Sequence, residues 1–183
     1  MHYIFIGFLL VFLDFNLNLG NSTIGLIPDF MGYYYMAKGL AELRQESPAF
    51  VSIRPFAVGM GFYSSVTYAL DLFGITGITG WLGVIIGIVG TVLSLYISYT
   101  VISGVRDMEA ARCADLNGAK LKSTWSLMAV FQGIAYISLV IPAVALVCII
   151  GGFVTSIVFL VAFYKSRDLY LALPPRQPGE REN

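Results

Sequence analysis

The feature that most constrains the fold is a series of long apolar segments that carry few charged residues. The segment from Trp81 to Val105 contains no Asp, Glu, Lys or Arg. About 20 residues of α-helix cross the ~30 Å hydrocarbon core of a bilayer, so segments of this length are able to span it. Inside a bilayer the backbone groups must all be hydrogen-bonded, which continuous apolar runs achieve as helices rather than as alternating barrel strands. The sequence therefore predicts an all-α, polytopic membrane helix bundle.

Composition supports this fold class. The chain has 183 residues, of which 57% are apolar and 12% are charged, whereas a soluble domain carries roughly 25% charged residues. Nearly all residues lie in apolar segments or in short connections between them. We therefore predict a single transmembrane domain over residues 1–172, followed by a disordered cytoplasmic tail over residues 173–183. The N-terminus has no basic region and no small-residue cleavage site before Asp14, so we expect a retained helix rather than a signal peptide.

The spacing of the apolar segments predicts six transmembrane helices, which fit three helical hairpins. We expect them at residues 3–19, 24–43, 55–73, 81–105, 125–149 and 153–170. Short uncharged turns would join the members of each hairpin, the last of them at Gly151–Gly152. In the fourth span the G-x-x-x-G pattern of Gly83 and Gly87 predicts close helix packing, and in the fifth span Pro142 predicts a kink.

The basic residues all fall on one side of this predicted topology. The other side has none, so the positive-inside rule places the basic loops and both termini in the cytoplasm of a cell-membrane protein. The residues concerned are Lys38, Arg44, Arg54, Arg106, Arg112, Lys120, Lys122, Lys165, Arg167, Arg176 and Arg181.

The unusual feature is a polar stretch that runs from Asp14 to Asp29 within the first predicted hairpin. An aspartate in the membrane interior costs roughly 2.5 to 3.5 kcal/mol on insertion scales, so it usually faces a protein interior or a wet cavity. If both arms are helical, the two carboxylates lie at equal depth and are able to share a proton or bind a cation.

A broken hairpin is the competing geometry. Residues Asp14 to Leu19 alternate polar and apolar with period two, which is typical of extended chain, and Pro28 suits the first turn of a helix. The first span would then be a helix to Leu13, an irregular connection and a new helix from Pro28. Either geometry predicts a polar cavity that opens away from the basic side.

Five residues are therefore candidates for ligand or ion binding: Asp14, Asn16, Asn18, Asp29 and Asp71. Asp71 shares one face of the third predicted helix with Ser64, Thr67 and Tyr68. A structural role is the alternative for each of them. Asp29 would complement the dipole of a helix that begins at Pro28, the other hairpin residues would satisfy irregular backbone, and the third-span residues would bond neighbouring helices. No catalytic residue, cofactor or metal site is predicted, because the single histidine, His2, stands alone at the terminus.

One segment resembles a known family. The run Gly25–Tyr33, the Lys38–Leu40 segment and the residues from Arg54 to about Phe73 are similar to an uncharacterised family of small bacterial multi-pass membrane proteins (hypothetical proteins). The resemblance implies a bacterial inner-membrane location and brings no specific chemistry.

Two functional classes are consistent with these features. The first is a small transporter or membrane substrate-binding subunit with an outward-facing polar site. The alternative is a membrane scaffold or regulatory subunit that acts through its cytoplasmic loops, of which Arg106–Lys122 is the longest and most charged. An enzyme is the least favoured class, since the sequence holds no convincing nucleophile–base pair. The lipid bilayer is the predicted partner; a protein partner or a homo-oligomer stays open, the ligand is unspecified, and no nucleic acid is expected.

Overall fold

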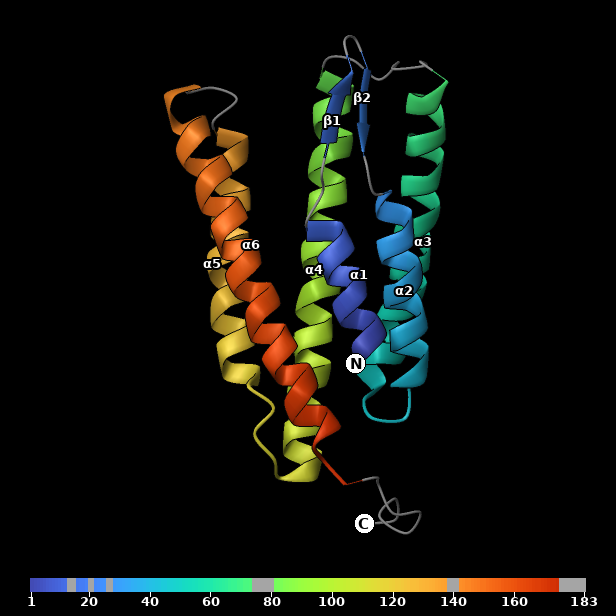
Figure 1. Ribbon diagram of the computed structural model, residues 1–183, viewed down its shortest axis with the longest axis vertical. Coiled ribbons are helices and arrows are strands. Elements are labelled where there is room, and N and C mark those ends of the chain that lie inside the picture. Colours follow the sequence, from blue (N-terminus) through green and yellow to red (C-terminus); the bar gives the residue numbers. More distant parts are fainter. Residues whose placement is uncertain (13–15, 20–21, 26–27, 74–80, 138–141, 175–183) are drawn as a thin grey trace.

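The computed structural model describes residues 1–12, 16–19, 22–25, 28–73, 81–137 and 142–174. These residues form a helical bundle, elongated along one axis, with one short two-stranded sheet (Figure 1). In chain order the elements are α1 (His2–Phe12), β1 (Asn16–Leu19), β2 (Ser22–Gly25), α2 (Asp29–Glu42), α3 (Pro48–Leu72), α4 (Trp81–Arg112), α5 (Gly118–Ile137) and α6 (Pro142–Leu171). The all-α prediction is confirmed for the large majority of the described residues.

Consecutive helices pack as three pairs, α1 with α2, α3 with α4 and α5 with α6, and α2 also packs closely on α3. Glycines bring α1 and α2 together. A Cβ on Gly7 would lie 2.7 Å from the carbonyl oxygen of Gly32, and a Cβ on Gly39 would lie 2.6 Å from Cγ1 of Ile4. Real Cβ atoms do not approach other atoms this closely, so these positions require glycine.

The first predicted hairpin is broken. Helix α1 ends at Phe12, and α2 begins at Asp29 after Pro28, whose backbone is extended. Between them, β1 pairs antiparallel with β2, with Asn16 opposite Gly25. The period-two alternation therefore predicted the extended backbone correctly at β1, and the geometry with two fully helical arms is wrong.

Helices α3 and α4 are longer than the apolar pattern predicts. Helix α3 begins at Pro48 rather than Pro55, because proline is favoured in the first turn of a helix and the Ser47 hydroxyl accepts a hydrogen bond from the Ala49 N–H at 3.1 Å. Helix α4 continues beyond Val105 as far as Arg112. The α4 extension is polar, which hydropathy assigns to a loop, whereas the α3 extension places Phe50 and Ile53 in the core.

The boundary between the last two helices differs from the prediction. Gly151 and Gly152 lie inside α6, which begins at Pro142. Proline is favoured at the first position of a helix, where its missing N–H removes no hydrogen bond, so Pro142 starts a helix instead of kinking one. The Phe131 ring of α5 packs directly against Gly151, so this glycine serves helix packing rather than a turn.

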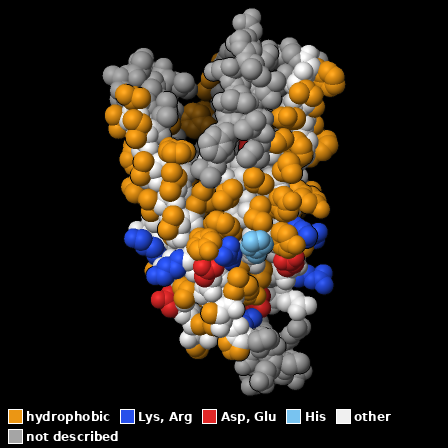
Figure 2. Space-filling view, viewed as in Figure 1, with side chains coloured by type: hydrophobic (Ala, Val, Ile, Leu, Met, Phe, Trp, Pro, Cys, Tyr) orange, Lys and Arg blue, Asp and Glu red, His pale blue; other side chains and the backbone are white. Residues whose placement is uncertain are grey.

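Charged side chains gather at one end of the molecule, which we call the basic end (Figure 2). There Arg112 forms a salt bridge with Glu46 of the α2–α3 loop. Glu109 Oε1 accepts hydrogen bonds from the N–H groups of Leu116, at 2.8 Å, and Gly118, at 2.7 Å. These contacts fix the α2–α3 loop and the start of α5 to the end of α4.

Two helical segments, Gly83–Arg112 and Leu146–Leu171, are long and apolar enough to cross a membrane, judged by length and composition. Helix α1 has 11 residues and α2 has 14, which correspond to about 16 and 21 Å. Neither of these two helices alone reaches across a ~30 Å hydrocarbon core. The first two predicted transmembrane helices are therefore not continuous helices of full length.

Candidate functional site

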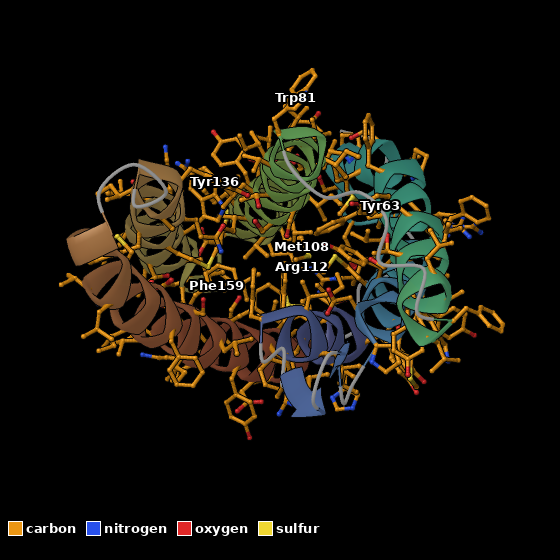
Figure 3. The ribbon with its side chains drawn as sticks, turned by 90° about the horizontal axis from the view of Figure 1, so that it is seen from above. Tyr63, Trp81, Met108, Arg112, Tyr136 and Phe159 are labelled. Carbon is orange, nitrogen blue, oxygen red and sulfur yellow. The ribbon has the colours of Figure 1, made fainter. Side chains whose placement is uncertain are left out.

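A polar cavity of about 440 Å³ lies among α2, α3, α4 and α5, with the end of α1 beside it. It lies toward the end of the bundle that carries β1 and β2, opposite the basic end, and Figure 2 shows a hollow at this end on the side of α5 and α6. Its polar lining consists of Asp29, Tyr33, Tyr63, Ser64, Thr91, Ser94, Gln132 and Tyr136. Seen from above, Tyr136 and Tyr63 lie on opposite sides of α4 (Figure 3).

Helix α2 supplies the cavity's carboxylate. Asp29 lies in the first turn of the helix, where the helix dipole favours a negative charge. Tyr33 follows four residues later on the same face, and it lines the cavity with Asp29. Asp29 Oδ1 is buried, while the residue as a whole is partly exposed, so the carboxylate lies in the wall of the cavity.

A hydrogen-bonded group joins α4 to α5 on the other side of the cavity. The Tyr136 hydroxyl donates to the Gly87 carbonyl oxygen at 2.9 Å, and it also bonds the Thr91 hydroxyl. Because a phenol has one proton, the Thr91 hydroxyl is the donor to Tyr136. This arrangement fixes the Tyr136 ring against α4.

Gly87 does not serve the close helix packing that its G-x-x-x-G pattern predicts. A Cβ at this position would meet no atom of the described residues within 4 Å, and Gly87 lines the cavity. The absence of a side chain leaves open space and exposes the carbonyl oxygen to Tyr136.

The chemistry of the lining suits a small, positively charged ligand. The cavity offers one carboxylate, hydroxyl groups on all four of its helices and the amide of Gln132. Hydroxyl and amide groups both donate and accept hydrogen bonds, whereas an ionised carboxylate only accepts them. The volume falls within the range of about 300 to 1,000 Å³ that is typical of small-molecule sites. Among the residues that the structure describes, no cluster of three or more His, Cys, Asp or Glu side chains is placed to hold a metal ion.

Comparison of the chain with protein-family models, with curated proteins and with solved structures found no match. The function must therefore be argued from the geometry of the cavity.

The five predicted site residues have different outcomes. Asp29 lines the cavity, and its part in binding stays a prediction. Asp14 lies outside the described residues. Asn16 and Asn18 belong to β1 and Asp71 to the last turn of α3, and for these three the structure describes the backbone alone. Their part in binding stays a prediction.

Only part of the polar face predicted on the third span, which comprises Ser64, Thr67, Tyr68 and Asp71, lies at the cavity. Ser64 lines it beside Asp29. Thr67 is exposed and donates its hydroxyl proton to the Tyr63 carbonyl oxygen at 3.0 Å, and Tyr68 packs edge-on against Phe30. Among the described side chains of the predicted face, Ser64 alone therefore lines the cavity.

The sequence does contain a signal for the residues that prediction missed. Gly87, Gly90, Thr91 and Ser94 recur at the spacing of a single helical face. On α5, Gln132 and Tyr136 are four residues apart and share a face in the same way. A stripe of small and polar residues on an otherwise apolar helix was the available indication of a cavity wall.

Proposed function

We propose that this chain is an integral membrane protein with six crossings that binds a small cationic ligand in the cavity around Asp29. Large apolar side chains on α3 and α6 point outward: Phe62 is 73% exposed, Leu146 67% and Val161 64%. Orange apolar side chains are the commonest coloured side chains on the surface between the basic end and the grey residues (Figure 2). Soluble monomers rarely present apolar surface on this scale, and a bilayer would cover it.

The first two crossings would each combine a helix with a strand. Four residues of strand add about 13 Å, so α1 with β1, and β2 with α2, approach the ~30 Å needed to cross. Extended backbone at membrane depth must have its hydrogen bonds satisfied within the protein. The pairing of β1 with β2 satisfies the backbone groups on their facing edges, and β2 also packs against α3.

The orientation follows from charge. The basic end would face the cytoplasm under the positive-inside rule, with both termini on that side, and the cavity would open outward. The resemblance of Gly25–Tyr33 to small bacterial multi-pass proteins favours a bacterial inner membrane.

Within this topology the chain would act as a small transporter or as the substrate-binding subunit of a larger one. The observation that carries the proposal is the Asp29 carboxylate, held in a 440 Å³ cavity whose other polar groups are neutral. In an apolar, membrane-embedded setting, carboxylates are typical of ion and substrate pathways. The scaffold alternative has less support, because Glu109 and Arg112 of the predicted docking loop hold the fold together.

Thermal unfolding of the purified protein tests the proposal. Inorganic cations and small amines are added to the wild type, to Asp29→Asn and to the control Asp168→Asn, which removes a half-exposed carboxylate at the basic end. A ligand at 100 times its Kd stabilises the folded state by about 2.7 kcal/mol. We expect stabilisation of the wild type and of the control but not of Asp29→Asn. Equal stabilisation of all three proteins, or none across the panel, would contradict the proposal.

A further inference from the structure

A second hollow lies on the outer surface of the bundle between α3 and α4. This apolar groove has a volume of about 550 Å³ and includes Pro55, Phe56 and Gly59 of α3 together with Val89 and Leu93 of α4. Within the part of the chain that the structure describes, a Cβ on Gly59 would meet no atom within 4 Å, so the floor of the groove is open at this point. From Phe56 to Tyr63 the groove follows α3 for about 10 Å.

The groove and the polar cavity are neighbours that share one wall. Met60, Tyr63, Ile86 and Gly90 line both of them. At this junction the Tyr63 ring lies over Gly90, with Cε1 4.0 Å from the position of a Cβ, and Tyr63 remains 41% exposed. The wall between the polar cavity and the outer surface is therefore one tyrosine ring beside a glycine and two aliphatic side chains.

We propose that the cavity and the groove form one site for a single-chain amphiphile with a cationic head group, such as a long-chain amine. The head lies beside the Asp29 carboxylate and the hydroxyl groups, and the chain lies in the groove along α3 and α4. This inference rests on the proposed function, because it requires the groove to face the bilayer and the cavity to bind a cation.

Two arguments select this occupant. The cavity carries a carboxylate and the groove carries no charged side chain, so a cationic head with an apolar chain complements both parts. The bilayer is as apolar as the groove, so the amphiphile's chain gains little free energy by moving from the bilayer into the groove. The groove instead gives a route by which an amphiphile dissolved in the bilayer reaches the carboxylate while its chain stays in apolar surroundings.

Photolabelling in lipid nanodiscs tests the inference. The probe is dodecylamine with a diazirine at the end of its chain, in phosphatidylcholine nanodiscs, and the labelled residues are mapped by mass spectrometry. Unlabelled dodecylamine, butylamine and dodecanol serve as competitors. The variants are Asp29→Asn, which removes the charge, and Gly59→Leu, which fills the groove. Gly152→Leu is the matched control, because a Cβ there also meets no atom within 4 Å and the residue lies on α6 away from both hollows.

We expect labels on residues 55–63 and 86–93 that dodecylamine suppresses and dodecanol does not. Loss of a charge-assisted hydrogen bond corresponds to about a tenfold change in affinity. Labelling should therefore fall about tenfold in Asp29→Asn. In Gly59→Leu the labels on residues 55–63 and 86–93 should fall because the leucine side chain occupies the space of the amphiphile's chain, and in Gly152→Leu they should be unchanged. The dodecanol comparison uses the wild type alone, so it stands even where Asp29→Asn does not fold.

The other outcomes separate the two proposals. Equal labelling of all variants, or competition by dodecanol, means a chain dissolved in the bilayer and overturns the inference. If butylamine binds with Asp29 dependence, competes as well as dodecylamine and is unaffected by Gly59→Leu, the cation site stands and the amphiphile inference falls. If neither amine shows an effect that depends on Asp29, the proposed function falls with it.

Discussion

The contact between α1 and α2 allows a test of the fold, because the two helices approach so closely at Gly7 that there is no space for a Cβ. In Gly7→Ala the new methyl group would lie 2.7 Å from the Gly32 carbonyl oxygen and 2.9 Å from both N and Cβ of Met36. Two of these three atoms belong to the backbone of α2, so no side-chain rotation relieves the overlap. The helices must separate, which disturbs the packing of the whole pair.

The magnitude follows from two opposing effects. Overpacking of this kind costs about 1 to 3 kcal/mol, and alanine in a helix is more favourable than glycine by about 1 kcal/mol. Gly152→Ala provides the matched control, because its methyl group meets no atom within 4 Å and the variant gains helix propensity alone. The propensity term cancels between the two variants. We therefore expect Gly7→Ala to be less stable than Gly152→Ala by about 1 to 3 kcal/mol.

Reversible unfolding by sodium dodecyl sulfate in mixed micelles, followed by circular dichroism, measures this difference. Wild type, Gly7→Ala and Gly152→Ala are unfolded under the same conditions, and their free energies of unfolding are compared. Equal stability of the two alanine variants would refute the close approach of α1 and α2.

Two further variants test contacts at opposite ends of the bundle by the same unfolding measurement. Glu109→Leu removes the acceptor for the Leu116 and Gly118 N–H groups, so we expect a loss of about 1 to 3 kcal/mol; a variant as stable as wild type would show that this carboxylate does not cap α5. Tyr136→Phe removes the donor to the Gly87 carbonyl oxygen, and we expect a loss of about 1 kcal/mol; an unchanged free energy of unfolding would mean that this bond does not tie α5 to α4.

Local chemistry made part of the fold predictable. The Asn16–Leu19 alternation indicated extended chain, and the Pro28–Asp29 pair indicated a helix start, because both signals act within a few residues. The broken hairpin, with α1 ending at Phe12 and α2 beginning at Asp29, follows from these two signals.

The boundary between α5 and α6 lies beyond what local signals determine. No charged residue occurs from Ser123 to Tyr164, so hydropathy does not mark where the chain turns. The sequence predicts the turn at Gly151–Gly152, whereas α6 begins at Pro142. The packing of Phe131 against Gly151 connects residues on two helices, and a single sequence gives no sign of it.

The candidate site likewise contains one residue that local signals predict and contacts that depend on how the helices pack. Asp29 was predictable because placing a carboxylate in an apolar membrane segment costs free energy, so such a residue is a candidate for a functional site. The bond between Tyr136 and Gly87 joins residues 49 positions apart and depends on which faces of α4 and α5 meet. The periodicity of Gly87, Thr91 and Ser94 marks one wall, but it does not identify the opposite one.

In the proposed topology the cavity opens to the outer side of a membrane that the chain spans, and cysteine accessibility measures this orientation. Ser64→Cys places a thiol in the cavity wall, in a background where the buried Cys148 is replaced by alanine. The exposed native Cys113 marks the basic end. A membrane-impermeant maleimide is added to intact expressing cells and to inverted membrane vesicles. We predict that Ser64→Cys reacts in intact cells and Cys113 only in inverted vesicles. Reaction of Cys113 in intact cells, or of Ser64→Cys only in inverted vesicles, would contradict the account.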